Sequence, residues 1–216
     1  MDQKLFYLIN ERWTNPVLDL FMAAMSDSEI WKPFLILAGL CILIFGRFRA
    51  RAFMFCLLLS LLVGQQVTNL LKSAIARPRP RHVQTVRMVQ LQEARPKFLT
   101  VFKKPTIRYS NQSDRKRSTR AFPSGHVADN TVIAVCLTLF YRRRGWLYWF
   151  IAGAIGYSRI YLGAHWPSDV LGTVFLATGE TLLIIGALEL LWRRAAPKWF
   201  SRLYARHPGL VLDPAQ

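Results

Sequence analysis

The chain has 216 residues, 52% of them hydrophobic, and 29 lysines and arginines against 12 aspartates and glutamates, a net charge of +17. Nucleic-acid-binding proteins rarely devote half their residues to apolar runs, so this composition argues against that class. It favours a membrane protein in contact with the bilayer and with anionic lipid. The length fits one domain over residues 1–216. The three cysteines lie in apolar runs without paired spacing, so neither a disulfide framework nor a metal site is expected.

Residues 2–27 hold two short hydrophobic segments, each below the roughly 20 residues that a helix needs to span a bilayer. We expect interfacial or partly embedded helices, with one bent crossing as the alternative. The apolar stretch Leu5 to Ile9 is too short for a signal peptide, and none is expected. Pro33 to Gly46, extended at its start by Ile30 and Trp31, is a short but plausible crossing.

The twenty uncharged residues from Ala52 to Leu71 predict a helix long enough to cross. Its second half carries a polar stripe at helical spacing that ends at Lys72. We expect its other members to hydrogen-bond between helices, because polar groups at membrane depth face the bundle interior: Gln65, Thr68 and Asn69.

Residues 73–122 form the longest non-hydrophobic section, with thirteen basic residues against Glu93 and Asp114. This loop is either a solvated linker or a collar that gathers anionic headgroups. Within it, Arg77 and Arg81 are interpreted as solvated or headgroup-binding charges.

Three further helices are predicted, over Gly125 to Tyr141, Trp146 to Leu162 and Ser168 to Trp192. Four glycines within them are expected to let helices approach closely: Gly153, Gly156, Gly172 and Gly179. A basic juxtamembrane tail occupies 193–216. The sequence thus predicts an all-α membrane bundle of about five to six helices. If the four strongest crossings alternate, the basic turns at 47–51 and 142–144 and the tail share one face. The polar motifs described next then share the opposite face.

The stretch S-R-I-Y-L-G-A-H-W-P-S-D, residues 158–169, precedes the last helix. Pro167 suits the first turn of a helix, which leaves His165 just outside its N-terminus. We expect the Asp169 carboxylate to hydrogen-bond His165 and to orient its ring. Free backbone N–H groups at the helix start, with Arg159, predict an anion site.

Two other stretches carry residues suited to the same anion chemistry. In P-S-G-H, residues 123–126, Ser124 is expected to cap a helix, Gly125 to let a phosphate approach the backbone, and His126 to lie in the first turn. Earlier, Lys72 is followed by Arg79 and a proline. The order K-x6-R-P, P-S-G-H, S-R-x5-H-x3-D resembles the three-part signature of the type 2 phosphatidic acid phosphatase superfamily, with every position filled from Lys72 to Asp169.

The resemblance implies a metal-independent membrane lipid phosphatase without a cofactor, in a bacterial inner membrane, with the site facing the periplasm or exterior. His165 would be the nucleophile that forms a phosphohistidine, and His126 the general acid and base. Phosphate would be held by the remaining signature positions: Lys72, Arg79, Ser124, Gly125 and Arg159.

The substrate stays open between undecaprenyl diphosphate and a glycerophospholipid phosphate. A lipid A phosphatase or lipid-to-lipid phosphotransferase is the alternative. The alternative from another class is a basic membrane protein that binds anionic lipid without turnover. The sequence leaves the oligomeric state open.

Overall fold

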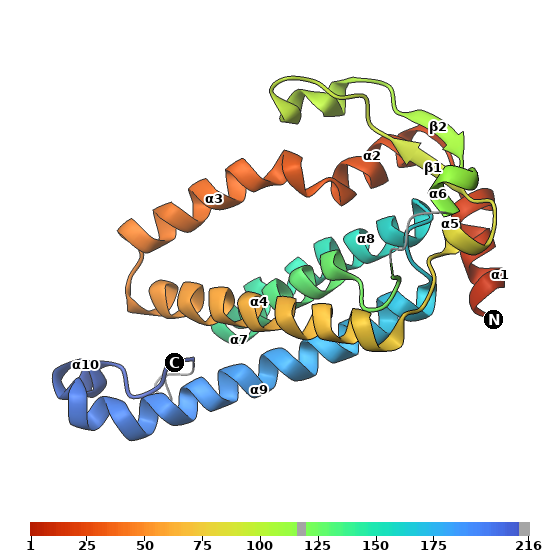
Figure 1. Cartoon of the computed structure of the whole chain (residues 1–216). Helices are drawn as coiled ribbons and strands as arrows, with labels where there is room; N and C mark the ends of the chain where they lie inside the picture. The colour runs from red at the N-terminus through yellow and green to blue at the C-terminus, as the bar shows by residue number, and fades with distance from the viewer. Residues whose placement is uncertain (116–119, 212–216) are drawn as a thin grey trace.

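The computed structural model describes residues 1–115 and 120–211, which form a bundle of long helices with a small lobe at one end (Figure 1). The long elements are α2 (Pro16–Ser26), α3 (Ser28–Phe45), α4 (Phe48–Ile75), α7 (Gly125–Trp146), α8 (Tyr148–Tyr161) and α9 (Pro167–Trp199). The short ones are α1 (Asp2–Tyr7), the π-helical turn η1 (Leu8–Arg12), α5 (Pro80–Val83), β1 (Arg87–Gln90), the 3-10 turn η2 (Lys97–Phe102), β2 (Thr106–Tyr109), α6 (Gln112–Arg115) and α10 (Ser201–Arg206).

Helix α7 is the centre of the bundle, because it packs against α4, α8 and α9. Among the described helices, α3, α4 and α9 are long and apolar enough to cross a membrane by length and composition. The predicted all-α membrane bundle is confirmed. Two apolar cores run along it. One contains Phe6, Tyr161 and Trp166 near the polar motifs, and the other contains Phe53 and Phe140 toward the opposite end.

The basic turns meet at the end of the bundle opposite the motifs, as predicted. Arg49 donates to the carbonyl of Phe140 and lies 5.8 Å from the centre of the Tyr141 ring. The turn between α3 and α4 therefore touches the end of α7. In Figure 1 the C-terminal end of α9 reaches this same end of the bundle. Two long helices separate each of these basic segments from the next, and one long helix separates each of them from the motifs.

The section 73–122 is folded where it is described, although its sequence shows almost no periodicity. Strands β1 and β2 pair antiparallel, with Arg87 opposite Tyr109. The described part of this section is the small lobe, and it contacts α2 through β1 and α3 through η2. The Asn10 amide donates to the carbonyls of Arg87 and Tyr161, at 2.9 and 2.7 Å, and so fastens the lobe to α8. Lys116 and Arg117 lie outside the described residues.

One of the four expected close helix contacts is present, because a Cβ at Gly156 of α8 would lie 3.0 Å from Val170 of α9. A Cβ at Gly172 would lie 3.0 Å from the ring of Phe122, which precedes α7 and belongs to no helix, so this glycine does not bring two helices together. The prediction is wrong for Gly153 and Gly179, where no described heavy atom outside the local helix lies within 4 Å of the added carbon. The polar stripe also differs from expectation. Gln65 and Asn69 hydrogen-bond to each other on an exposed face of α4 rather than to another helix.

Candidate active site

The three motifs meet at one end of the bundle, at the end of α4, the starts of α5, α7 and α9, and the end of α8. Lys72 lies in the last turn of α4, and Arg79 is the N-cap of α5. Arg120 joins them, because its guanidinium donates to the Lys72 carbonyl at 2.6 Å and its own carbonyl accepts from Arg79 Nε at 3.2 Å. A Cβ at Gly125 would lie 3.9 Å from Lys72 Nζ, so the start of α7 faces the same ammonium. The first and second motifs therefore form one surface.

His165 lies in the turn between α8 and α9 and is 2% exposed. Its Nδ1 is 2.6 Å from the carbonyl oxygen of Ala121, an acceptor, so Nδ1 must carry the proton and donate. Nε2 of the neutral ring then keeps its lone pair. Burial, with the positive charges of Arg159 and Arg79, lowers the pKa of His165 well below its usual 6.5. The imidazole is neutral at pH 7 and has a nucleophilic nitrogen available.

The expected hydrogen bond between Asp169 and His165 is wrong. The Asp169 carboxylate turns back along its own helix and accepts from the backbone N–H of Trp166 at 2.9 Å, which caps α9. Its other oxygen accepts from Arg77 at 2.7 Å. A carboxylate in the first turn is closest to the orphan N–H groups of that turn, and these outcompete a side chain outside the helix. The ring of His165 is instead oriented by a backbone carbonyl.

The interpretation of Arg77 as a solvated or headgroup-binding charge is also wrong. Besides Asp169, its guanidinium donates to Ser168 Oγ and to Asp2 Oδ2, both at 2.8 Å. Asp2 also accepts from the Ser168 backbone N–H at 3.0 Å. Burial acts to raise the pKa of Asp2, but the hydrogen bonds from Ser168 and Arg77 lower it overall. The N-terminus of the chain therefore holds the start of α9, a role that no local pattern around Asp2 predicts.

Ser124 occupies the N-cap position of α7, but its hydroxyl caps nothing. It is fully buried, and within the described part of the chain its Oγ has no hydrogen-bond partner. Its backbone N–H donates to Thr173 Oγ1 at 3.0 Å, and Thr173 in turn donates to the Asp169 carbonyl at 2.6 Å. Sequence reasoning missed Thr173, although its position one turn after Asp169 places it on the inner face of α9. The fold therefore leaves the Ser124 hydroxyl as a buried donor without a partner among the described residues.

Positive charge concentrates around these groups. Arg159 ends α8 and donates to Ser26 Oγ, while its Nε is buried without a partner among the described residues. Burial, with the neighbouring charge of Arg81, lowers the pKa of Arg79 to about 10, so it stays charged at pH 7. Lys72 adds a third charge beside His165. Three cations, the buried hydroxyl of Ser124 and the start of a helix suit a phosphate group.

His126 lies in the first turn of α7, as predicted, and forms part of an apolar pocket. The pocket has a volume of about 290 Å³ and lies between the α2–α3 junction, α7 and α8. Its lining is Met25, Ser28, Trp31, Leu35, His126, Asn130, Tyr148, Ile151 and Ile155. The pocket therefore lies directly beside the His126 ring. Over residues 1–115 and 120–211, no group of three His, Cys, Asp or Glu side chains is arranged to hold a metal.

The fold is that of a polytopic helical membrane protein, with two histidines and three cationic side chains gathered at one end of the bundle. The PAP2 superfamily model matches residues 53–194, and the chain belongs to this superfamily.

The chain is similar in sequence to several bacterial membrane-lipid enzymes and related proteins. The lipid A 4'-phosphatase of Porphyromonas gingivalis is 25% identical, over 95% of this chain and 72% of its own length. The bacitracin transport permease protein BcrC of Bacillus licheniformis is 38% identical over 36% of this chain, and the undecaprenyl-diphosphatase BcrC of Bacillus subtilis is 35% identical over 32%. These two matches span only about a third of each relative, 34% and 33%. The crystal structure of Aquifex aeolicus LpxE has the same fold, with a TM-score of 0.60 and 24% identity over 86% of this chain and 94% of that one.

Proposed function

We propose that this protein hydrolyses a lipid phosphate or diphosphate through a phosphohistidine on His165. The observation that supports it best is the Nδ1 hydrogen bond from His165 to the Ala121 carbonyl. That bond leaves the Nε2 lone pair free in a site crowded with cations. Burial of a histidine beside three positive charges perturbs its titration strongly, and such perturbed groups are typical of functional sites rather than of structural histidines.

Two displacements at phosphorus follow from this arrangement. His165 Nε2 attacks the phosphorus, the bond to the lipid oxygen breaks, and His126 donates a proton to that oxygen. His126 then accepts a proton from water, the water oxygen attacks the phosphohistidine, and inorganic phosphate leaves with His165 regenerated. Arg159, Arg79 and Lys72 neutralise the charge on the equatorial oxygens, and the Ser124 hydroxyl and Gly125 N–H add donors. Asp169 acts as a positioning residue, because it holds the start of α9 and Arg77.

Undecaprenyl diphosphate and glycerophospholipid phosphates are the first substrates to test, and a relative named as an undecaprenyl-diphosphatase supports the former. Dephosphorylation of lipid A, or phosphate transfer between lipids, is the second candidate. It is favoured by the lipid A 4'-phosphatase, whose similarity extends along 95% of the chain. We place all of residues 1–216 in one phosphatase domain, in a bacterial inner membrane, with the site on the periplasmic or exterior side. Labelling of single cysteines introduced beside the site, in intact cells, tests that orientation.

Phosphate release by purified protein in detergent tests the mechanism. His165→Ala is expected to abolish release, and Arg159→Lys to reduce it severely, because a point charge cannot replace a bidentate guanidinium. His207→Phe is the matched control, since His207 stacks on Phe48 at the far end of the bundle and a phenyl ring preserves that stack. Substantial turnover by His165→Ala would refute the phosphohistidine. If the wild-type protein bound anionic lipid but released no phosphate, the non-enzymatic alternative would stand.

A further inference from the structure

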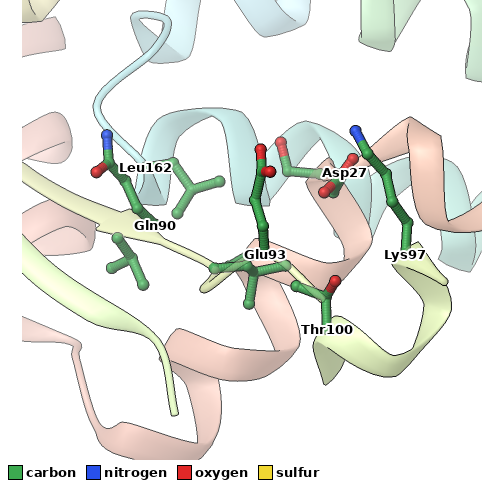
Figure 2. Close-up of a pocket in the computed structure, with 10 residues that line it drawn as sticks. Asp27, Gln90, Glu93, Lys97, Thr100 and Leu162 are labelled. Atoms are coloured by element: carbon green, nitrogen blue, oxygen red, sulfur yellow. The ribbon is translucent and has the colours of Figure 1, made fainter. Parts of the chain in front are cut away.

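A second pocket lies beside the phosphate site, between the end of α2, strand β1 and the turn η2. Its volume is about 330 Å³, within the range of small-molecule sites. Its lining is Ala23, Ser26, Asp27, Val89, Gln90, Leu91, Glu93, Lys97, Thr100 and Leu162. Figure 2 shows Asp27, Glu93 and Lys97 extending from three separate segments toward the same side of the pocket.

This pocket shares a wall with the groups that bind phosphate. Ser26 lines it and accepts a hydrogen bond from Arg159. Leu162 lines it from the end of the helix that carries Arg159. The same α2–α3 junction also separates it from the apolar pocket, because Met25 and Ser28 line the apolar side and Ser26 and Asp27 the polar side. An amphiphile with its phosphate at Arg159 would thus have an apolar pocket on one side and a polar pocket on the other.

The chemistry of the lining indicates what the polar pocket would hold. Two carboxylates face one ammonium, so a second phosphate or another anion is disfavoured there, although the surrounding section 73–122 is strongly basic. Carboxylate, amide and hydroxyl oxygens from Asp27, Glu93, Gln90 and Thr100 are acceptors for several O–H donors. Aliphatic side chains of Val89, Leu91 and Leu162 supply an apolar wall. A ring with hydroxyls at its edge and C–H groups on its faces matches both features.

We propose that this pocket is a headgroup subsite that selects lipids whose phosphate is carried on a hydroxyl-bearing sugar. The proposal rests on the proposed lipid phosphatase function and, among its candidate substrates, favours lipids with a sugar headgroup over undecaprenyl diphosphate and simple glycerophospholipid phosphates. Hydroxyls on the sugar donate to Asp27 and Glu93 while the phosphate lies between Arg159 and His165. A lipid phosphate without such a headgroup, such as phosphatidic acid, uses only the phosphate and apolar sites.

The test compares two substrates with matched acyl chains, a diacylglucosamine 1-phosphate and phosphatidic acid, in the same detergent. The measured quantity is the ratio of their kcat/KM values, in the wild type and in Asp27→Asn, Glu93→Gln and the double variant. Asparagine preserves the helix cap that Asp27 provides to the Glu29 N–H at 3.0 Å, so the fold of α3 is maintained. Glu11→Gln is the control, because it removes an equal charge at a residue that does not line the pocket.

We expect each single variant to lower the ratio of kcat/KM for the sugar lipid to kcat/KM for phosphatidic acid about tenfold, through a higher KM for the sugar lipid. The loss of one hydrogen bond to a charged group weakens binding by about this factor. The control should leave the ratio unchanged. An unchanged ratio in the double variant, with both lipids still hydrolysed, would overturn the headgroup subsite and leave the phosphatase assignment intact. An equal loss on both lipids would also overturn it, as a general effect on folding or on the phosphate site. Absence of phosphate release from either lipid by the wild type would instead refute the proposed function.

Discussion

The contact between Asp169 and Arg77 makes a prediction that separates two roles for the aspartate. Asp169 is fully buried, whereas the Arg77 side chain is 36% exposed, and their nearest atoms are 2.7 Å apart. If Asp169 acts by holding Arg77 and the start of α9, removing either partner should damage the site in the same way. If it acted directly on His165, Arg77 would contribute little.

The expected size of the effect follows from the burial of the pair. A hydrogen bond to a charged group contributes about 1.5–3 kcal/mol, and the solvent around Arg77 favours the lower value, about 1.5 kcal/mol. Since about 1.36 kcal/mol is a factor of ten, Asp169→Asn and Arg77→Ala should each lower kcat/KM by at least about tenfold. The double variant should lose little more than either single variant, which gives a coupling energy of about 1.5 kcal/mol.

The assay is a double-mutant cycle on kcat/KM, read as phosphate released from a short-chain lipid phosphate in detergent. Arg77→Lys should be more active than Arg77→Ala, because lysine restores the positive charge but not the bidentate donors of the guanidinium. Arg202→Ala in α10 is the control for loss of a distant positive charge. The thermal midpoint of each variant separates lost folding from lost catalysis. Additive losses, with Arg77→Ala close to wild type and Asp169→Asn strongly impaired, would refute the positioning role.

Three further predictions concern pH, metals and the basic section. Because burial and nearby cations depress the pKa of His165, lowering the pH should protonate it only well below 6.5, so kcat/KM should hold through pH 6.5 on the acid side. Half-loss at or above that pH would contradict a depressed pKa. Activity should survive excess EDTA and be inhibited by vanadate, whereas loss on chelation with recovery in magnesium would disprove metal independence. Neutralising five basic positions should raise KM with little change in kcat, by an amount that shrinks as salt increases: Lys103, Lys104, Arg115, Lys116 and Arg117. An unchanged KM at low ionic strength would refute the role of the section as a collar that gathers anionic headgroups.

Much of this molecule follows from the sequence alone. The uncharged run before Lys72 and the apolar run after Pro167 can satisfy their backbone polar groups in a membrane only as helices, so these two long crossings were predictable. The motif order along these runs, with the basic turns between them, also placed Lys72, His126 and His165 at one end. That prediction needed only the number of helices between the motifs, because an even number returns the chain to the same end of the bundle.

The tertiary structure decided which polar groups pair with one another. Whether His165 meets Asp169 or the carbonyl of Ala121 depends on how a fifty-residue section folds back over the bundle, and that section has no periodicity to read. Asp2 lies 166 residues from its partner Ser168, and Arg77 lies 92 from Asp169. Hydrogen bonds are short-ranged and directional, so partners that distant in the chain are selected only once the helices have packed.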